Sequence, residues 1–179
     1  MNTSSTFNFR WRSWLGMSVA LLLFYGVTNV LAAIIVPVSL HRNGPWAVGG
    51  LVLTEATDTA VLGPSLTTLS NTDPALRAFL VSFMDTMCAF MMAFALLHLA
   101  VVWFGLRRAQ WWALWAAAIG DLAIVPYYAA ISITYDRVGA PIGSTLTDFV
   151  LAPAAIILVA TALGWFGLRR AQRQSPATA

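Results

Sequence analysis

The chain has 179 residues, of which 59% are hydrophobic and only 9% are charged. Soluble domains are about 45–50% apolar and about 25% charged, and disordered chains combine low hydrophobicity with high net charge. The composition excludes both classes and indicates an integral membrane protein. The formal net charge of +3 comes with ten arginines and no lysine. These arginines lie at predicted helix ends rather than in basic patches with exposed aromatics, so we expect no nucleic-acid partner.

Hydrophobic runs predict four transmembrane helices, because one crossing needs roughly 20 apolar residues. The predicted helices cover residues 12–39, 74–106, 110–133 and 147–168. The first run is longer than a signal-peptide core, which favours a retained helix, with cleavage near Ala33 as the alternative. Asp73 and Pro74 predict a capped helix start, and Asp148 predicts another. Pro126 predicts a kink in the third helix.

These elements predict an all-α membrane protein, a four-transmembrane-helix bundle that forms one domain over residues 1–173. The segment 41–73 is rich in Thr, Gly and Pro and predicts a long outer loop. Within it, the stretch from Gly50 to Leu62 fits either a short hairpin or an interfacial helix, since its periodicity is ambiguous. The polar residues 174–179 predict a disordered tail.

The arginines also predict how the chain is oriented. If four helices cross, Arg42, Arg77 and Arg137 fall on one side and the other seven arginines fall on the opposite side. Cytoplasmic segments carry an excess of arginine, so we expect both termini to be cytoplasmic and the protein to lie in the cell inner membrane. Seven tryptophans occupy the same ends, as in an interfacial aromatic belt. They are Trp11, Trp14, Trp103, Trp111, Trp112, Trp115 and Trp165.

One octapeptide, Trp-Phe-Gly-Leu-Arg-Arg-Ala-Gln, occurs at residues 103–110 and again at 165–172. Convergence on a good membrane anchor is one explanation, since aromatic rings and snorkelling arginines suit an interface. Duplication of a helical hairpin is the other, and it predicts that the second and fourth helices are equivalent and run in the same direction.

Polar groups inside the predicted helices are candidate sites, because they are costly in a bilayer and usually face the protein interior. A rise of about 1.5 Å per residue places Asp121 roughly 14–18 Å from the inner boundary. An ionised Asp near the midplane costs about 2.5–3.5 kcal/mol, so we expect a neutral or proton-exchanging carboxyl that faces the interior near Tyr25 or Asn29. Tyr128 lies on the same predicted face, and Asp85 lies at the outer edge. The candidates for a substrate or proton path are therefore Asp121, Asp85, Tyr128, Asn29 and Tyr25.

We expect the remaining polar side chains and the sulfur-containing ones to have structural roles. His98 lies about 140° around its helix from Asp85, so we interpret it as a packing residue outside any relay with Asp85. Four methionines around Cys88 fit Cu(I), but methionine more often fills irregular packing gaps. We therefore predict no metal and no cofactor. The outer acids predict a solvated rim, made of Glu55, Asp58, Asp73 and Asp136.

Three functions fit these residues. The first is a transport-related or proton/cation-coupled protein with an intramembrane carboxylate, in which a homo-oligomer or a membrane partner subunit completes the path. The second is an accessory subunit of a larger membrane complex. The third is a small enzyme that performs acid–base chemistry, such as isomerisation or cyclisation, on a lipophilic substrate. We favour a role without catalysis, because the chain lacks phosphate-loop, zinc-protease and nucleophile-elbow motifs and no catalytic residue can be assigned.

Overall fold

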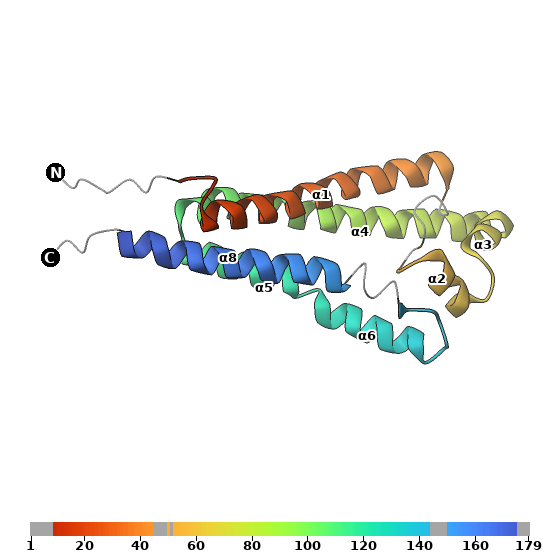
Figure 1. The fold of residues 1–179 in the computed structure, drawn as a ribbon. Helices are drawn as coiled ribbons and strands as arrows, with labels where there is room; N and C mark the ends of the chain where they lie inside the picture. The colour runs from red at the N-terminus through yellow and green to blue at the C-terminus, as the bar shows by residue number, and fades with distance from the viewer. Residues whose placement is uncertain (1–8, 45–49, 51, 144–149, 175–179) are drawn as a thin grey trace. The chain divides into compact units, whose positions relative to one another are not determined.

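The computed structural model describes residues 9–44, 50, 52–143 and 150–174. Every long element in these ranges is a helix, and the helices follow one another as Figure 1 shows. In chain order they are α1 (Trp14–Asn43), α2 (Glu55–Leu62), α3 (Leu66–Thr72), α4 (Pro74–Ala100), η2 (Val101–Gly105), η3 (Leu106–Arg108), α5 (Trp111–Leu122), α6 (Val125–Asp136) and α8 (Ala152–Gln174).

Four stretches are long and apolar enough to cross a membrane. They are Trp14–Asn43, Pro74–Arg108, Trp111–Asp136 and Ala152–Arg173. The prediction of an all-helical chain with four candidate spans is therefore confirmed for the described residues. Such a chain is suited to be a multi-pass membrane protein, because each stretch exceeds or approaches the roughly 20 residues of one crossing.

Two helices extend beyond the ends that hydropathy predicts. α1 continues to Asn43, so that His41 belongs to its last turn, and α8 continues to Gln174 rather than ending at residue 168. Hydropathy marks only the apolar part of a helix, whereas backbone hydrogen bonding continues through arginine, which is a good helix former. The predicted cap at Asp148 and the tail from residue 175 onward lie outside the described residues.

The outer segment between α1 and α4 contains two short helices. Thr54 caps α2 in a capping box, because its hydroxyl accepts from the Thr57 backbone N–H while the Thr57 hydroxyl accepts from the Thr54 N–H. Ser65 caps α3 through the Thr68 backbone N–H. The hairpin alternative is therefore wrong for residues Glu55–Leu62, which are helical.

Local chemistry sets two further helix starts. Oδ1 of Asp73 accepts hydrogen bonds from the backbone N–H groups of Ala75 and Leu76, at 2.9 and 3.2 Å, which confirms the predicted cap of α4. Pro126 lies in the first turn of α6, where its missing N–H costs nothing. Near the predicted kink, the turn residues Ala123 and Ile124 separate α5 from α6, and both keep right-handed helical backbone angles.

The chain divides into two compact units. The first comprises Met1–Val27, Leu96–Ala123 and Ala154–Ala179, and the second comprises Thr28–Ala95 and Ile124–Pro153. α1 and α4 contribute residues to both units.

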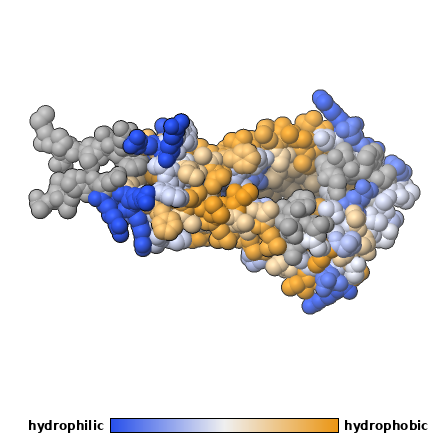
Figure 2. Space-filling view, in the orientation of Figure 1, coloured by the Kyte–Doolittle hydropathy of each residue, from blue (hydrophilic) through white to orange (hydrophobic). Residues whose placement is uncertain are grey.

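The core of the first unit is built from α1, η2, η3, α5 and α8. Its buried side chains are Leu15, Val19, Leu22, Val102, Leu106, Ala113, Leu114, Ala117, Ala160 and Leu168. Small residues let the helices approach closely. A Cβ atom at Gly167 of α8 would clash with the backbone nitrogen of Leu15 in α1. Figure 2 shows hydrophilic residues at one end of this unit, next to an apolar band.

Candidate functional site

The most buried pair of ionisable side chains lies in the first unit, between α4 and α5. Nδ1 of His98 lies 3.0 Å from Oδ1 of Asp121, and only 2% and 0% of the two side chains are exposed. The contact has ion-pair distance, but it is not aligned as a hydrogen bond to Oδ1. Two groups that can each gain or lose a proton are therefore held together away from water.

The other ring nitrogen of His98 fixes which tautomer is present. Nε2 lies 2.9 Å from the backbone carbonyl oxygen of Leu22 in α1. Since a carbonyl only accepts, Nε2 must carry a proton and donate it. Nδ1 then either bears a second proton opposite an ionised Asp121 or presents a lone pair opposite a protonated one.

One turn of α1 forms the wall around His98. Leu22 supplies the carbonyl, and the Tyr25 ring meets the imidazole edge-on, with ring centroids 5.8 Å apart. A Cβ atom at Gly26 would lie 2.9 Å from Cδ2 of His98 and 2.7 Å from a methyl carbon of Leu99. Glycine is therefore required at this position so that α1 can approach the imidazole.

Asp121 keeps one oxygen that the described residues do not satisfy. Its Oδ2 atom is buried and has no hydrogen-bond partner among them. On α5 its buried neighbours include Ala117 and Ala118, which carry no polar side-chain atoms. A buried carboxyl oxygen without a partner is costly, and this cost falls when that oxygen carries a proton or meets an incoming ligand.

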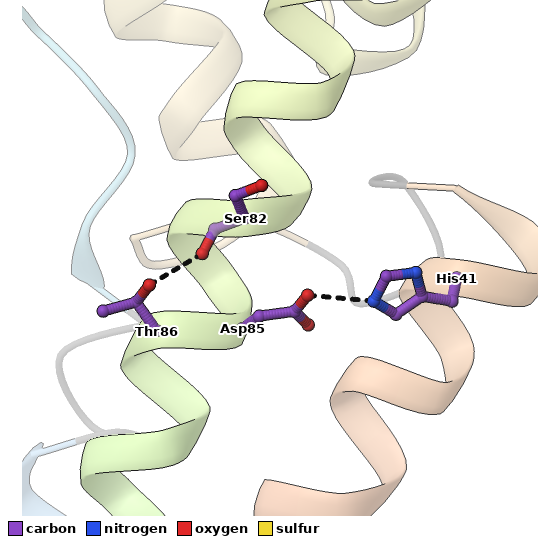
Figure 3. A network of polar contacts seen from close by, with 4 residues as sticks. All are labelled: His41, Ser82, Asp85 and Thr86. Carbon is purple, nitrogen blue, oxygen red and sulfur yellow. Dashed lines mark hydrogen bonds and ion pairs between the residues drawn. The ribbon is translucent and has the colours of Figure 1, made fainter.

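A second His–Asp pair occurs in the second unit, between α1 and α4. Nε2 of His41 lies 2.9 Å from Oδ2 of Asp85, as Figure 3 shows. Here 61% of the His41 side chain and 37% of the Asp85 side chain are exposed. Next to Asp85 in the chain, the Thr86 hydroxyl donates to the Ser82 carbonyl oxygen at 2.9 Å. Asp85 is thus a partly exposed ion-pair partner.

The five predicted site residues fall in both units. Tyr25 and Asp121 belong to the first unit and both flank His98. Asn29, Asp85 and Tyr128 belong to the second unit. Asn29 is half-buried on α1, and Tyr128 packs on a small core formed by Leu53, Tyr135 and Ala140. Asp121 belongs to α5 and Tyr128 to α6, and their shared face stays a prediction.

Sequence reasoning assigned Asp58 to a solvated rim, and that assignment is wrong. Only 2% of Asp58 is exposed. Its Oδ1 accepts from the Tyr135 hydroxyl at 3.0 Å, and its Oδ2 accepts from the Val52 backbone N–H at 3.2 Å. The polar surroundings in sequence gave no sign of this burial, because the partner on α6 is 77 residues away.

His98, which sequence reasoning interpreted as a packing residue, is the side chain that contacts Asp121. A signal for its partner existed, because His98 and Asp121 each lie eleven residues from the turn at Ala109 and Gln110. In an antiparallel helical hairpin, residues equally far from the turn lie at the same level. A projection of one helix does not show this symmetry, because it relates His98 only to residues of its own helix.

The described residues contain no group of three His, Cys, Asp or Glu side chains that could hold a metal ion. His98 and Asp121 can each bind a proton, and their contact is at ion-pair distance. Comparisons with protein-family models, with curated proteins and with solved structures found no match to this chain.

Proposed function

We propose that the protein is a transport-related, proton- or cation-coupled membrane protein whose working carboxyl is Asp121. His98 is its proton partner. The observation that carries the proposal is the fully buried contact between Nδ1 of His98 and Oδ1 of Asp121, 3.0 Å apart, in a stretch of chain suited to cross a membrane. Buried ionisable groups in membrane helices commonly mark ion or proton pathways.

The chemistry of the pair supports proton coupling. The Leu22 carbonyl keeps a proton on Nε2, so one further proton can reside on Nδ1 or on Asp121. Either arrangement leaves the pair neutral overall, which suits a site of low dielectric constant. A cation or proton that reaches Oδ2 would give Asp121 the partner that this oxygen lacks among the described residues.

The test is proton uptake by reconstituted protein. Purified protein is placed in liposomes that contain a pH-sensitive dye, and an inside-negative potential is set with potassium and valinomycin. We expect the wild-type protein to acidify the lumen, and we expect Asp121→Asn to insert and fold but to lose this uptake. Asn keeps the shape of Asp121 but does not exchange a proton at neutral pH.

Asp85→Asn is the matched control, because Asp85 also lies on a long apolar helix and also contacts a histidine. Uptake should survive this change. If Asp121→Asn and the wild-type protein acidify the lumen equally with sodium, potassium or no added cation, the proposed role of Asp121 is contradicted.

An accessory subunit is the second candidate, and the complete burial of both side chains favours it. In that role the pair ties α4 to α5, and interhelical polar contacts of this kind contribute about 0.6 kcal/mol on average in membranes. Asp121→Asn would then be nearly silent, while purification with native lipids would recover a larger complex whose other subunits mass spectrometry identifies.

The finer architecture belongs to the same proposal. We infer a four-helix bundle, with the repeated octapeptide derived from a duplicated hairpin, in the cell inner membrane with both termini cytoplasmic. The arginine distribution supports this orientation. Because four helices are few for a transport path, we expect a homo-oligomer or a membrane partner subunit, which cross-linking in native membranes would detect.

The orientation has a direct test. A reporter fused after Ala179 should behave as cytoplasmic, whereas one inserted near Ser65 should behave as external. The reverse pattern would overturn the orientation.

A further inference from the structure

The two units differ in the sign of their charge. The first unit contains seven of the ten arginines and a single acidic residue, Asp121, whereas the second contains three arginines and six acidic residues. Asp121 is buried against His98 and cannot serve as a surface counter-ion. The first unit therefore offers its seven arginines no acidic side chain as a surface partner.

Two of these arginines are held in the same way. The guanidinium carbon of Arg107 lies 4.2 Å from the ring centroid of Trp103, and that of Arg169 lies 4.4 Å from the ring centroid of Trp165. Each pair takes the same two positions of the repeated octapeptide, four residues apart. Both distances are well within the roughly 6 Å limit of a cation–π contact. We call these pairs the two Trp–Arg stacks.

A stacked guanidinium is prepared to bind a phosphate group. A guanidinium above an aromatic ring carries its N–H donors at the edge of its own plane, where they can still meet an acceptor. This planar fork matches two oxygens of a phosphate. Because the ring restricts the arginine beforehand, less conformational entropy is lost on binding.

The surface next to the stacks fits a lipid better than a free anion. Large apolar side chains are exposed beside the arginines, including Phe104 at 60%, Trp112 at 56% and Phe166 at 57%. Arg108 approaches the Phe104 ring at 6.0 Å, and Arg170 approaches the Trp14 ring at 5.7 Å. Aromatic rings of this kind sit at the level of lipid headgroups, with acyl chains on one side.

We propose that the two Trp–Arg stacks, Trp103–Arg107 and Trp165–Arg169, are binding sites for the phosphate groups of anionic phospholipids. The partner class is a glycerophospholipid with a net negative headgroup, such as phosphatidylglycerol, rather than a zwitterionic lipid. Each stack provides one site, and the exposed apolar side chains beside it contact the acyl chains.

The experiment uses the full chain in neutral detergent. Phosphatidylglycerol or phosphatidylcholine is added, and native mass spectrometry counts the lipids retained while a thermal melt records the midpoint. We expect the wild-type protein to retain one or two more phosphatidylglycerol than phosphatidylcholine molecules and to melt at a higher temperature with the former. Inorganic phosphate at the same concentration should give no comparable rise.

The variants distinguish the contribution of the two Trp–Arg stacks to lipid binding from the contribution of net charge. Arg107→Gln combined with Arg169→Gln should abolish the preference for phosphatidylglycerol. Arg42→Gln combined with Arg137→Gln removes the same charge from exposed arginines of the second unit and should leave the preference intact. Trp103→Leu combined with Trp165→Leu keeps the charge but removes both stacks, and should weaken binding by about two- to fivefold.

If the double glutamine variant does not fold, Arg107→Lys combined with Arg169→Lys carries the test, because it keeps the charge and loses the planar donors. We expect the preference to fall in this variant. Equal retention of the two lipids by the wild-type protein, an equal loss in the Arg42 and Arg137 control, an unchanged preference in the lysine variant, or an equal rise with inorganic phosphate would overturn the proposal.

Discussion

The described part of the chain contains two His–Asp pairs of nearly equal separation in very different surroundings. The atoms of His98 and Asp121 in the first unit lie 3.0 Å apart, and those of His41 and Asp85 in the second unit lie 2.9 Å apart. The first pair is at most 2% exposed, whereas 61% and 37% of the second pair's side chains are exposed. The distance between the contacting atoms therefore does not distinguish the two pairs.

Burial is what separates the two pairs. An exposed ion pair gains about 0–1 kcal/mol, because water and salt screen the charges. A buried pair pays a large desolvation cost, so that removing one partner leaves the other charged or unpaired at a cost of about 3–5 kcal/mol. The same chemical pair can therefore have a large effect on the free energy of unfolding in one unit and almost none in the other.

The largest effect is expected for Asp121→Leu. This change leaves Nδ1 of His98 buried without its partner, and we expect a loss of about 3 kcal/mol in the free energy of unfolding. Denaturant unfolding in detergent micelles measures it. Asp85→Leu should cost less than about 1 kcal/mol, and equal losses for the two variants would contradict the comparison.

The next largest effect on stability is expected at Gly26, where α1 approaches the buried His98. In Gly26→Ala, the added methyl group would press on His98 and Leu99, and overpacking of this kind costs about 1–3 kcal/mol. A matched enlargement at the exposed Ala116 of α5, Ala116→Val, should change the unfolding midpoint very little. A silent Gly26→Ala would mean that α1 does not approach His98 this closely.

Asp58 in the second unit provides a buried carboxyl with both oxygens satisfied. Tyr135→Phe removes the hydroxyl that donates to Oδ1 and should lower the free energy of unfolding by about 1–2 kcal/mol, because a buried acceptor loses this hydrogen bond. Tyr127→Phe, at a hydroxyl on a tyrosine that is 72% exposed, is the control. The thermal midpoint in detergent should fall only for Tyr135→Phe.

The smallest effect is expected at the exposed pair. A double-mutant cycle with His41→Gln and Asp85→Asn should give a coupling energy of about 0.2–1 kcal/mol, which should shrink further as salt is added. A coupling above about 2 kcal/mol would show that this pair is shielded from water in the membrane-embedded protein, since exposed pairs do not reach that value.

The repeated octapeptide shows how far identical residues determine structure. In its first copy the backbone passes from the π-helical turn η2 into the 3-10 turn η3, and Ala109 adopts a left-handed φ of 59°. In its second copy the same eight residues continue as part of α8. The first copy must turn toward Trp111 at the start of α5, so the following chain, rather than the octapeptide, decides between a turn and a helix.

The Trp–Arg stack nevertheless forms in both copies. A contact between side chains four residues apart depends on local helical geometry, which both backbones approximate. Local features of this kind could be read from the sequence, as the Asp73 cap of α4 was. The surroundings of the two tryptophans could not be read from the sequence, because Trp165 packs on Trp111 and Trp115, which belong to another helix.

The sequence by itself determined the membrane class, the helical composition and the four candidate spans. Apolar length and local capping carry this information, and neither depends on how the helices pack. Only the tertiary structure decided that Asp121 meets His98, that Asp58 is buried beneath Tyr135, and that Asp85 pairs with His41. These contacts join residues 23 to 77 positions apart, and their energies depend on burial, which hydropathy along one helix does not specify.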